Sequence, residues 1–473
     1  MTEGLNKKQA FRLLICILIG ALFFVLPVPA GLSAAGWHVF GIFLATIVGL
    51  IIKPVPMGAA ALIAVIFLVL SRSVTITDAL SGFSNTTIWL IVMAFFISRG
   101  IIKTGLGERI AYLFVKKFGR KTINLAYALA FSDLLIAPAM PSNTARAGGI
   151  LSPIVRSLST AFDSNPKDGT ERKIGAYLTT TVFQCDMVTS AMFLTAMAAN
   201  PLTVSIAKDV LGVNITWESW FLAALLPGVL SLILIPIIIY RIDPPEIKET
   251  PRASGFAQKK LNDMGLLSKN EKYMIAVFIL LVLLWIFGGQ FGIDETLTAF
   301  IGLVILLLTG VLNWEDVKNE KGAWDTLIWF SVLVMMAQQL NATGMIPWFS
   351  TMISSAVSGM NWIAALCILA IIYFYSHYLF ASGTAHVSAM YSAFINVIAS
   401  AGAPSMMAAL LLAYFSNLFG CLTHYGMGPA PVFFGSGYVS QSKWWQIGFI
   451  LSIFHILMWG VVGGLWWKLL GIW

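Results

Sequence analysis

A short polar segment between two apolar runs is the feature that most limits how this chain can fold. Residues 140–149, MPSNTARAGG, separate two apolar runs, each about half as long as a membrane-spanning helix of ~20 residues. Polar backbone at mid-membrane depth is tolerated only where protein buries it or where it lines a wet cavity. The segment therefore predicts a re-entrant hairpin whose tip residues, Ser142, Asn143 and Thr144, face a cavity near the middle of a bilayer.

The same pattern occurs a second time. Residues 380–389, FASGTAHVSA, place Ser382 and Thr384 where the first segment has Ser142 and Thr144, and both pairs are 240 positions apart (382 − 142 = 240). This recurrence predicts a second re-entrant hairpin with a similar tip. An isolated serine and threonine in a membrane helix ordinarily bond to the preceding helical turn. The recurrence argues against that role here.

Two further motif pairs have nearly the same spacing. TTIW at 86–89 matches TLIW at 326–329, again 240 positions later, and Thr-Gly at 104–105 matches Thr-Gly at 343–344, one position short of that offset. Three separate matches with nearly one offset indicate an internal repeat that covers most of the chain.

The composition excludes a soluble protein. The chain has 473 residues, of which 58% are hydrophobic and 11% charged. We therefore expect an all-α polytopic membrane protein with about 11 transmembrane spans, surrounded by the lipid bilayer and working without a cofactor. The net charge of +8 does not predict a nucleic-acid partner, because the basic residues gather at the ends of apolar runs.

The repeat predicts how the chain is divided. We expect a first span at 1–36, a first repeat at 37–240 (scaffold 37–121, transport elements 122–240), a cytoplasmic linker at 241–272, and a second repeat at 273–473 (scaffold 273–361, transport elements 362–473). Within the transport elements, AANP at 198–201 and GMGPAP at 426–431 interrupt long apolar runs. Proline removes a backbone donor and clashes with the preceding turn, so both predict discontinuous helices.

Basic residues predict the orientation. No Lys or Arg occurs from residue 323 to residue 442, whereas the segment after the fourth span is rich in both. Because cytoplasmic loops carry the basic residues, we expect a cytoplasmic N-terminus and linker in a plasma-membrane protein. The two hairpins then enter from opposite sides, which makes the two halves an inverted repeat.

Inverted repeats with broken helices near the membrane midplane are typical of secondary transporters. Half-helix N-termini carry unsatisfied N–H groups and partial positive charge, so they bind anions. Two such tips facing each other would hold the two carboxylates of one short dianion. The tips thus predict a carrier for small dicarboxylates.

Other residues leave alternatives open. Three histidines, His377, His386 and His424, and the intramembrane Asp186 would suit a membrane-embedded enzyme, although the histidine spacing matches no metal-ligand motif. Asp133 and Asp186 are functional candidates because they lie in apolar stretches. A structural ion pair between one of them and Arg146 is an equally good interpretation.

The hairpin motifs and the repeat resemble the divalent anion–sodium symporter family. PSNTARAGG at 141–149 and THYGMGPAP at 423–431 resemble the branch with bacterial citrate and tartrate exchangers and the plastid 2-oxoglutarate/malate translocator. The resemblance covers nearly the whole chain. It implies an eleven-span elevator transporter, usually a homodimer, in which the hairpins and broken helices carry the substrate past a fixed scaffold.

The resemblance also implies which residues bind the substrate. By position these are Ser142, Asn143 and Thr144 on the first tip, Ser382 and Thr384 on the second, and Thr195, Gly428 and Pro429 at the broken helices. Gly383 departs from the pattern, because sodium-coupled members have an asparagine there whose oxygen lies near a sodium ion. Gly383 therefore weakens the case for a second sodium site.

Charge predicts the coupling. Importing a dianion into a negative-inside cell costs about 4.6 kcal/mol per 100 mV, so something must offset it. Arg146 and His386 each lie two residues after a tip threonine and are 240 apart. We expect Arg146, helped by His386 when protonated, to supply positive potential where symporters bind sodium. This favours sodium-independent antiport of C4/C5 dicarboxylates such as succinate, malate and 2-oxoglutarate; the alternative is a sodium-coupled dicarboxylate/citrate symporter.

Overall fold

The computed structural model describes residues 6–357 and 361–473, and every named element in these residues is helical. Eight of the described helices are long and apolar enough to cross a membrane, and three further apolar helices are shorter. The predicted all-α polytopic membrane fold is confirmed. The number of eleven spans stays a prediction.

The first half of the chain contains a peripheral helix and the first repeat. Its elements are α1 (Lys7–Val25), α2 (Ala34–Ile52), α3 (Met57–Leu70), α4 (Ile76–Ala79), η1 (Ser81–Ser84), α5 (Thr86–Thr104), α6 (Leu106–Phe118), α7 (Thr122–Ile136), η2 (Ala137–Ala139), η3 (Thr144–Leu151), α8 (Ser152–Ala161), η4 (Pro166–Asp168), α9 (Gly175–Met192), η5 (Leu194–Ala196), α10 (Ala199–Leu211) and α11 (Trp217–Ile242).

The second half contains a linker helix and the second repeat. Its elements are α12 (Arg252–Asp263), α13 (Lys269–Phe287), η6 (Gly288–Phe291), α14 (Glu295–Leu308), α15 (Trp314–Lys318), α16 (Lys321–Ala342), α17 (Met345–Val357), α18 (Trp362–Tyr375), η7 (Ser376–Leu379), α19 (Gly383–His386), η8 (Val387–Tyr391), α20 (Ser392–Ser400), α21 (Ser405–Leu418), η9 (Phe419–Cys421), α22 (Ala430–Phe434), α23 (Gln441–Leu457), η10 (Met458–Val462) and α24 (Gly463–Leu469).

The two halves have matching elements in the same order. Helices α2 to α8 correspond to α13 to α20, and each half then continues into a helix interrupted by non-helical backbone. The packing is reciprocal, because α5 of the first half packs on α14 while its counterpart α16 packs on α3. The predicted internal repeat is therefore confirmed.

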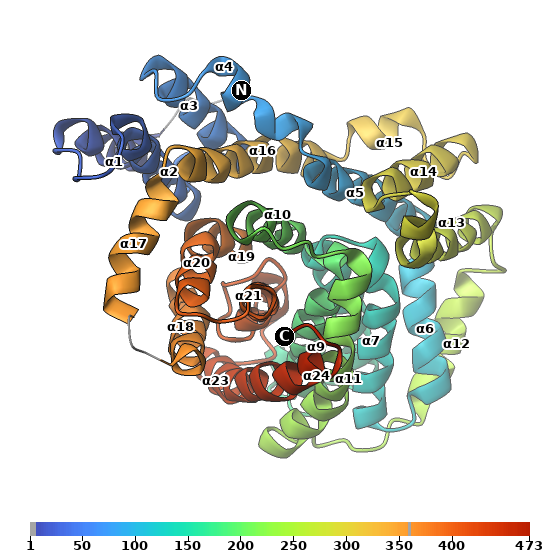
Figure 1. The fold of residues 1–473 in the computed structure, drawn as a ribbon. Helices are drawn as coiled ribbons and strands as arrows, with labels where there is room; N and C mark the ends of the chain where they lie inside the picture. The colour runs from blue at the N-terminus through green and yellow to red at the C-terminus, as the bar shows by residue number, and fades with distance from the viewer. Residues whose placement is uncertain (1–5, 358–360) are drawn as a thin grey trace.

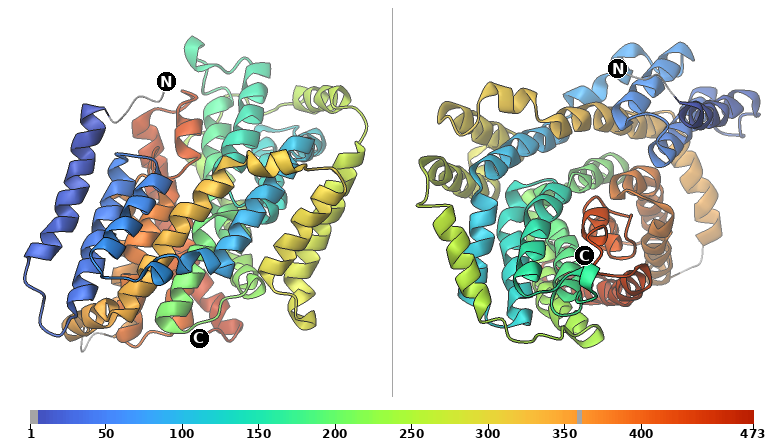
Figure 2. Two further views of the ribbon diagram at one scale, coloured as in Figure 1. Left: turned by 90° about the horizontal axis from the view of Figure 1, so that it is seen from above. Right: turned by 180° about the vertical axis from the view of Figure 1, so that it is seen from behind.

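The hairpins start at opposite ends of the molecule. Thr122, the first residue of α7, donates its hydroxyl to Ile247 O of the linker. Trp362, the first residue of α18, contacts Trp473 at the C-terminus, with ring centroids 5.9 Å apart. Linker helix α12 (yellow-green) and the C-terminus lie at opposite ends in the left view of Figure 2. The repeat is therefore inverted.

The helices form an outer layer and an inner group. Figure 1 shows α2, α16, α5, α14 and α13 along one side, with α6 and α12 at one flank and α17 at the other. The inner group comprises α7 to α11 and α18 to α24, with α21 near its centre. Every residue of α9 is buried, and α9 packs on α7, α11 and α21.

The linker at 241–272 packs against the first repeat. Its helix α12 packs along α6 and buries Ala253, Ala257 and Leu261. Thr250 is fully buried and donates its hydroxyl to Gly119 O at 2.9 Å. The linker is therefore held against one end of the first repeat, because apolar residues at intervals of four give its helix one packing face.

The first broken helix is interrupted earlier than its proline suggested. The non-helical residues lie between α9 and α10, from Phe193 to Ala198, with only the short turn η5 among them. Pro201 is the third residue of α10. The first turn of a helix needs no intrahelical N–H donor, so proline fits there. The second break, between η9 and α22, falls where it was predicted.

Candidate functional site

The first hairpin tip starts a half-helix inside the protein. After extended backbone at Met140, the Ser142 hydroxyl accepts a hydrogen bond from Ala145 N–H at 3.2 Å and so caps the π-helical segment η3. Asn143 is only 7% exposed, and its Nδ2 has no hydrogen-bond partner among the described residues. A buried amide donor without a partner is costly unless a ligand completes it.

The second tip has the same construction. The Ser382 hydroxyl accepts a hydrogen bond from Ala385 N–H at 3.3 Å and caps α19, and His386 N–H bonds to Ser382 O at 3.1 Å. The two predicted tip serines are thus helix caps that accept through their oxygens. Each hydroxyl hydrogen can still donate to a carboxylate.

The first tip lies against the second break. A Cβ built on Gly428 would overlap the hydroxyl of Thr144, so only glycine lets the tip approach this closely. Pro429 follows directly and precedes the first turn of α22. The structure thus brings together three of the predicted residues, Thr144, Gly428 and Pro429, from the two halves of the chain.

The second tip faces both breaks through methionines. A Cβ on Gly383 would lie 2.8 Å from Met427 Sδ and 3.0 Å from Met197 Cε. The absence of a side chain at Gly383 therefore also serves packing, a reason that sequence reasoning missed. Two flexible thioethers line the approach to this tip, and methionine adapts its shape easily to a ligand.

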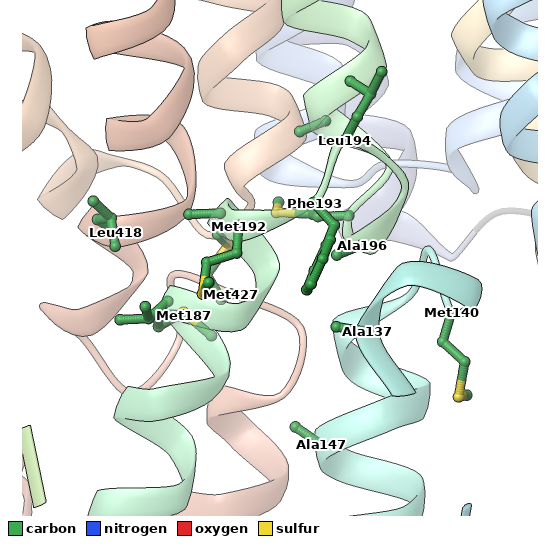
Figure 3. Packing of buried hydrophobic residues seen from close by; sticks show 14 of the residues in the cluster. Ala137, Met140, Ala147, Met187, Met192, Phe193, Leu194, Ala196, Leu418 and Met427 are labelled. Carbon is green, nitrogen blue, oxygen red and sulfur yellow. The ribbon is translucent and has the colours of Figure 1, made fainter. Parts of the chain in front are cut away.

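Figure 3 shows further apolar groups of the same region. Met427 lies close to Met187 and Met192 of the first broken helix, and Phe193 of the break extends toward the hairpin that carries Ala137. Nothing in the sequence pattern separated Met187 and Met192 from ordinary core residues, whereas Met427 lies within the predicted break.

Thr195 does not have a free hydroxyl, contrary to its predicted contact with substrate. Its Oγ1 donates to Pro138 O at 2.6 Å and accepts from Trp217 Nε1 at 3.2 Å, and the residue is buried. Its single hydroxyl hydrogen is used, so Thr195 cannot donate to a carboxylate in this conformation. Thr195 positions the first break against the first hairpin.

Arg146 lies completely buried beneath the first tip. Its Nε bonds to Asp133 Oδ1 at 2.6 Å, and its Nη2 bonds to Asp186 Oδ1 at 2.9 Å and to Ser190 Oγ at 2.8 Å. The other oxygen of Asp133 accepts from the Thr189 hydroxyl, whereas Asp186 Oδ2 has no hydrogen-bond partner in the part of the chain that is described. The ion pair with an intramembrane aspartate, the alternative interpretation, is therefore present.

The remaining donor of Arg146 joins two elements. Its Nη1 bonds to Met140 O of the hairpin at 2.9 Å and to Ala196 O of the first break at 3.0 Å. All five N–H groups of the guanidinium are therefore used within the protein. Arg146 cannot donate to a substrate in this conformation, and two carboxylates offset its single positive charge. The expectation that it adds net positive potential is not supported by this geometry.

His386 lies behind the second tip as one of a pair of histidines. Its Nδ1 is 3.1 Å from His377 Nδ1, and its Nε2 is 3.1 Å from Ser376 Oγ. His377 Nε2 lies 3.1 Å from Gly426 O at the second break. Since a carbonyl only accepts, His377 Nε2 carries a hydrogen, and a neutral His377 then accepts at Nδ1 from His386.

This network also accepts a second hydrogen on His386. Its Nε2 would donate to Ser376 Oγ, whose own hydroxyl donates to Tyr373 O at 2.8 Å. The rings of Phe380 and Phe419 stack on His386 with centroids 4.5 and 4.6 Å away, so the imidazole lies between two aromatic faces. Among the described residues, no carboxylate pairs with His386, and its complete burial favours the neutral ring unless a bound anion offsets the charge.

The three candidate histidines do not meet. His424 accepts from Trp445 Nε1 at 3.0 Å, apart from the His377–His386 pair. In residues 6–357 and 361–473, no group of three histidine, cysteine, aspartate or glutamate residues could hold a metal ion.

Two half-helix N-termini thus approach two breaks in the middle of an all-helical membrane protein. The donors at the tips are neutral, namely hydroxyls, the Asn143 amide and backbone N–H groups. Such an arrangement defines a secondary transporter by its class.

The chain belongs to the family described as the sodium:sulfate symporter transmembrane region, whose model matches residues 7–473. This confirms the resemblance to the divalent anion–sodium symporters. The chain is 60% identical over 471 residues to the putative malate transporter YflS of Bacillus subtilis, covering 99% of this chain and 98% of that protein. It is 49% identical to dicarboxylate transporter 1, chloroplastic, of Spinacia oleracea, over 98% of this chain and 81% of that protein.

Two more distant relatives have known locations or structures. Inner membrane protein YbhI of Escherichia coli is 39% identical over 99% of both chains. The crystal structure of the Alcanivorax borkumensis YdaH transporter has a TM-score of 0.57 over 98% of both chains at 12% identity, which shows a shared fold alone.

Proposed function

We propose that this protein exchanges C4/C5 dicarboxylates, of the succinate, malate and 2-oxoglutarate class, across the plasma membrane without sodium. The substrate class is supported by the names of its relatives, a malate transporter and a chloroplast dicarboxylate transporter. It is also supported by the two capped tips, because each half-helix N-terminus can hold one carboxylate. The inner-membrane relative supports the location.

The position of the Arg146 guanidinium is the observation that carries the sodium independence. Backbone carbonyls at unwound helix ends are the usual ligands of a coupling sodium ion. Here Met140 O and Ala196 O, one from the hairpin and one from the break, are bonded to Arg146 instead. A fixed cation fills this position, so hairpin and broken helix stay together without sodium.

Exchange then follows from the charge balance. A dianion that enters alone works against about 4.6 kcal/mol per 100 mV, whereas one dianion exchanged for another moves no net charge. Asp133 and Asp186 neutralise Arg146, so it brings no compensating charge, and only a protonated His386 would add one. The unpartnered amide of Asn143 also opposes the return of the carrier without substrate, because the amide would then cross the membrane without a hydrogen-bond acceptor.

We further propose an elevator movement with a cytoplasmic N-terminus, in a homodimer. In this proposal the outer helices α2, α3, α5, α13, α14 and α16 form the scaffold, and the two hairpins and two broken helices move together. The links between Arg146, Met140 and Ala196, and between Thr195 and Pro138, support the idea that the first hairpin and first break form one body.

Reconstituted protein tests the proposal. Uptake of labelled succinate into liposomes is measured with and without internal dicarboxylate, in sodium buffer and in choline buffer. We expect uptake only into preloaded liposomes and equal rates in both buffers. Uptake that needs sodium and ignores the internal substrate would instead establish the sodium-coupled symporter. No uptake under any condition would contradict the transport of dicarboxylates altogether.

A further inference from the structure

An apolar cavity of about 390 Å³ lies between α1, α2 and α3, away from the hairpin tips. It is lined by Leu13, Cys16, Ile17, Gly20, Ala21, Phe24 and Val25 of α1, by Ile42, Ala45, Thr46 and Gly49 of α2, and by residues of α3 and the turn before it. The hydroxyl of Thr46 donates to Ile42 O at 2.7 Å and is therefore already used. The walls suit a hydrocarbon and offer little to a dicarboxylate.

Small residues explain why α1 and α2 pack tightly and leave this groove open beside them. A Cβ on Gly20 would be 3.4 Å from Ala45 Cβ, and a Cβ on Gly49 would be 3.6 Å from Cys16 Sγ. Close approach through small residues is typical of membrane helices. In Figure 1, α1 lies outermost, with α2 between it and the core and α3 farther along the edge.

The same two contacts define the register of the antiparallel pair. Cys16 faces Gly49, and Gly20 faces Ala45, so facing residue numbers add to 65 in both cases (16 + 49 and 20 + 45). One turn farther toward the start of α1 lies Arg12, and Lys53 directly follows the last residue of α2, so the antiparallel packing places both residues at the same end of the pair. Two like charges therefore lie at one end of the groove.

A third cation extends the same row. Lys8, Arg12, Cys16 and Gly20 follow each other at intervals of four and so lie on one face of α1. Among the residues that the structure describes, Lys8, Arg12 and Lys53 form no ion pair with an acidic side chain. Neighbouring like charges repel, so an anion at this end of the groove would stabilise it.

We propose that this groove binds an anionic phospholipid, with an acyl chain between α1 and α3 and the headgroup phosphate between Arg12 and Lys53. An apolar groove with a basic rim matches the two parts of such a lipid. A free phosphate would use only the rim, and a helix from a second copy would use only the groove. Neither alternative accounts for both features.

Helix α2 connects the proposed lipid site to the second hairpin. Helix α2, which forms the floor of the groove, also packs on α16 and α17 and contacts α19 and η8 of the second hairpin. Occupancy of the groove would hold α2 in place where the second tip meets it. Anionic lipid is therefore expected to stabilise the protein and to affect transport without contacting the substrate.

Purified full-length protein tests this site with three probes. They are phosphatidylglycerol, phosphatidylcholine with the same acyl chains, and inorganic phosphate, and bound lipid is counted by native mass spectrometry. We expect the protein to retain phosphatidylglycerol in preference to the other two. The variant R12Q/K53Q should bind phosphatidylglycerol roughly ten- to thirtyfold more weakly, since each cation near an anionic headgroup contributes about a tenfold effect or less.

Two matched variants separate the parts of the site. K7Q/K318Q removes the same charge from other positions, since Lys7 lies off the row of Lys8 and Arg12, and it should bind lipid like the wild type. A21F fills the groove without changing charge and should also weaken binding of phosphatidylglycerol. The proposal would be overturned if the protein formed dimers through this groove and A21F abolished the dimers but not lipid binding. Equal lipid binding by R12Q/K53Q and the wild type would also overturn it. So would complete displacement of phosphatidylglycerol by inorganic phosphate.

Discussion

Replacement of Arg146 by alanine should produce a variant that sodium stabilises. In the structure, Arg146 is surrounded by oxygen atoms, with Asp133 Oδ1 at 2.6 Å, Asp186 Oδ1 and Met140 O at 2.9 Å, and Ala196 O at 3.0 Å. Removal of the side chain leaves these oxygens around a space that had held a cation. Carboxylate and carbonyl oxygens are the ligands that hard cations prefer.

The expected magnitude follows from the contacts that are lost. Removing one partner of a buried ion pair costs about 3–5 kcal/mol, because the remaining charge is left unpaired. Sodium that binds the vacated position would restore part of this. At a concentration of 100 times its dissociation constant, a ligand adds about 2.7 kcal/mol of stability.

The assay is thermal unfolding of the purified protein in sodium chloride and in choline chloride at equal ionic strength. Arg146→Ala should unfold at a lower temperature than the wild type, and sodium should raise its midpoint. The wild type should have the same midpoint in both salts. Arg156→Ala is the control, because the exposed Arg156 side chain bonds to Val432 O and to no other described residue, so this variant should show no sodium effect. If sodium stabilised the wild type as much as the variant, Arg146 would not occupy the position of a sodium ion.

Three further predictions concern the tips and the topology. Asn143→Ala should weaken dicarboxylate binding roughly ten- to a hundredfold, because a hydrogen bond to a charged group contributes about 1.5–3 kcal/mol; competition binding measures it. Gly428→Ala should abolish most transport, since its Cβ would overlap the threonine hydroxyl of the first tip, whereas Gly460→Ala, with no atom nearby, should be neutral. In a cysteine-free background, Lys259→Cys should react with an impermeant label only from the cytoplasm and Asn361→Cys only from outside.

A different result would contradict each of these three predictions. Wild-type affinity in Asn143→Ala would remove the amide from the site. Equal transport by the two glycine variants would mean that the tip does not need its close approach to the second break. Labelling of both cysteines from one side would contradict the proposed orientation and the entry of the hairpins from opposite faces.

The architecture was largely predictable because it depends on local patterns. A polar tip between two half-length apolar runs can only be re-entrant in a membrane, and its repetition after 240 positions defines the second hairpin. The position of the first break was less predictable. Pro201 shows where a helix cannot donate a hydrogen bond, but the first turn of α10 tolerates it, so the break precedes it.

The side-chain partners were not predictable, because they come from distant parts of the chain. Arg146 suited both a charge-compensating role and an ion pair, and only the fold brings Asp186, 40 positions away, into contact with it. Thr195 was expected to contact substrate, yet Trp217 and Pro138 occupy its hydroxyl. The close approach of Gly428 to the first tip likewise depends on packing between the two halves.

Simultaneous measurement of both fluxes tests obligatory exchange. Liposomes that contain the protein and tritiated succinate are placed in sodium-free buffer with carbon-14 malate, and uptake and efflux are counted together at zero and at −100 mV. One-for-one exchange predicts that one succinate is released for each malate taken up, and that this ratio does not change with voltage. Malate uptake without succinate release, or a ratio that shifts with voltage, would contradict it.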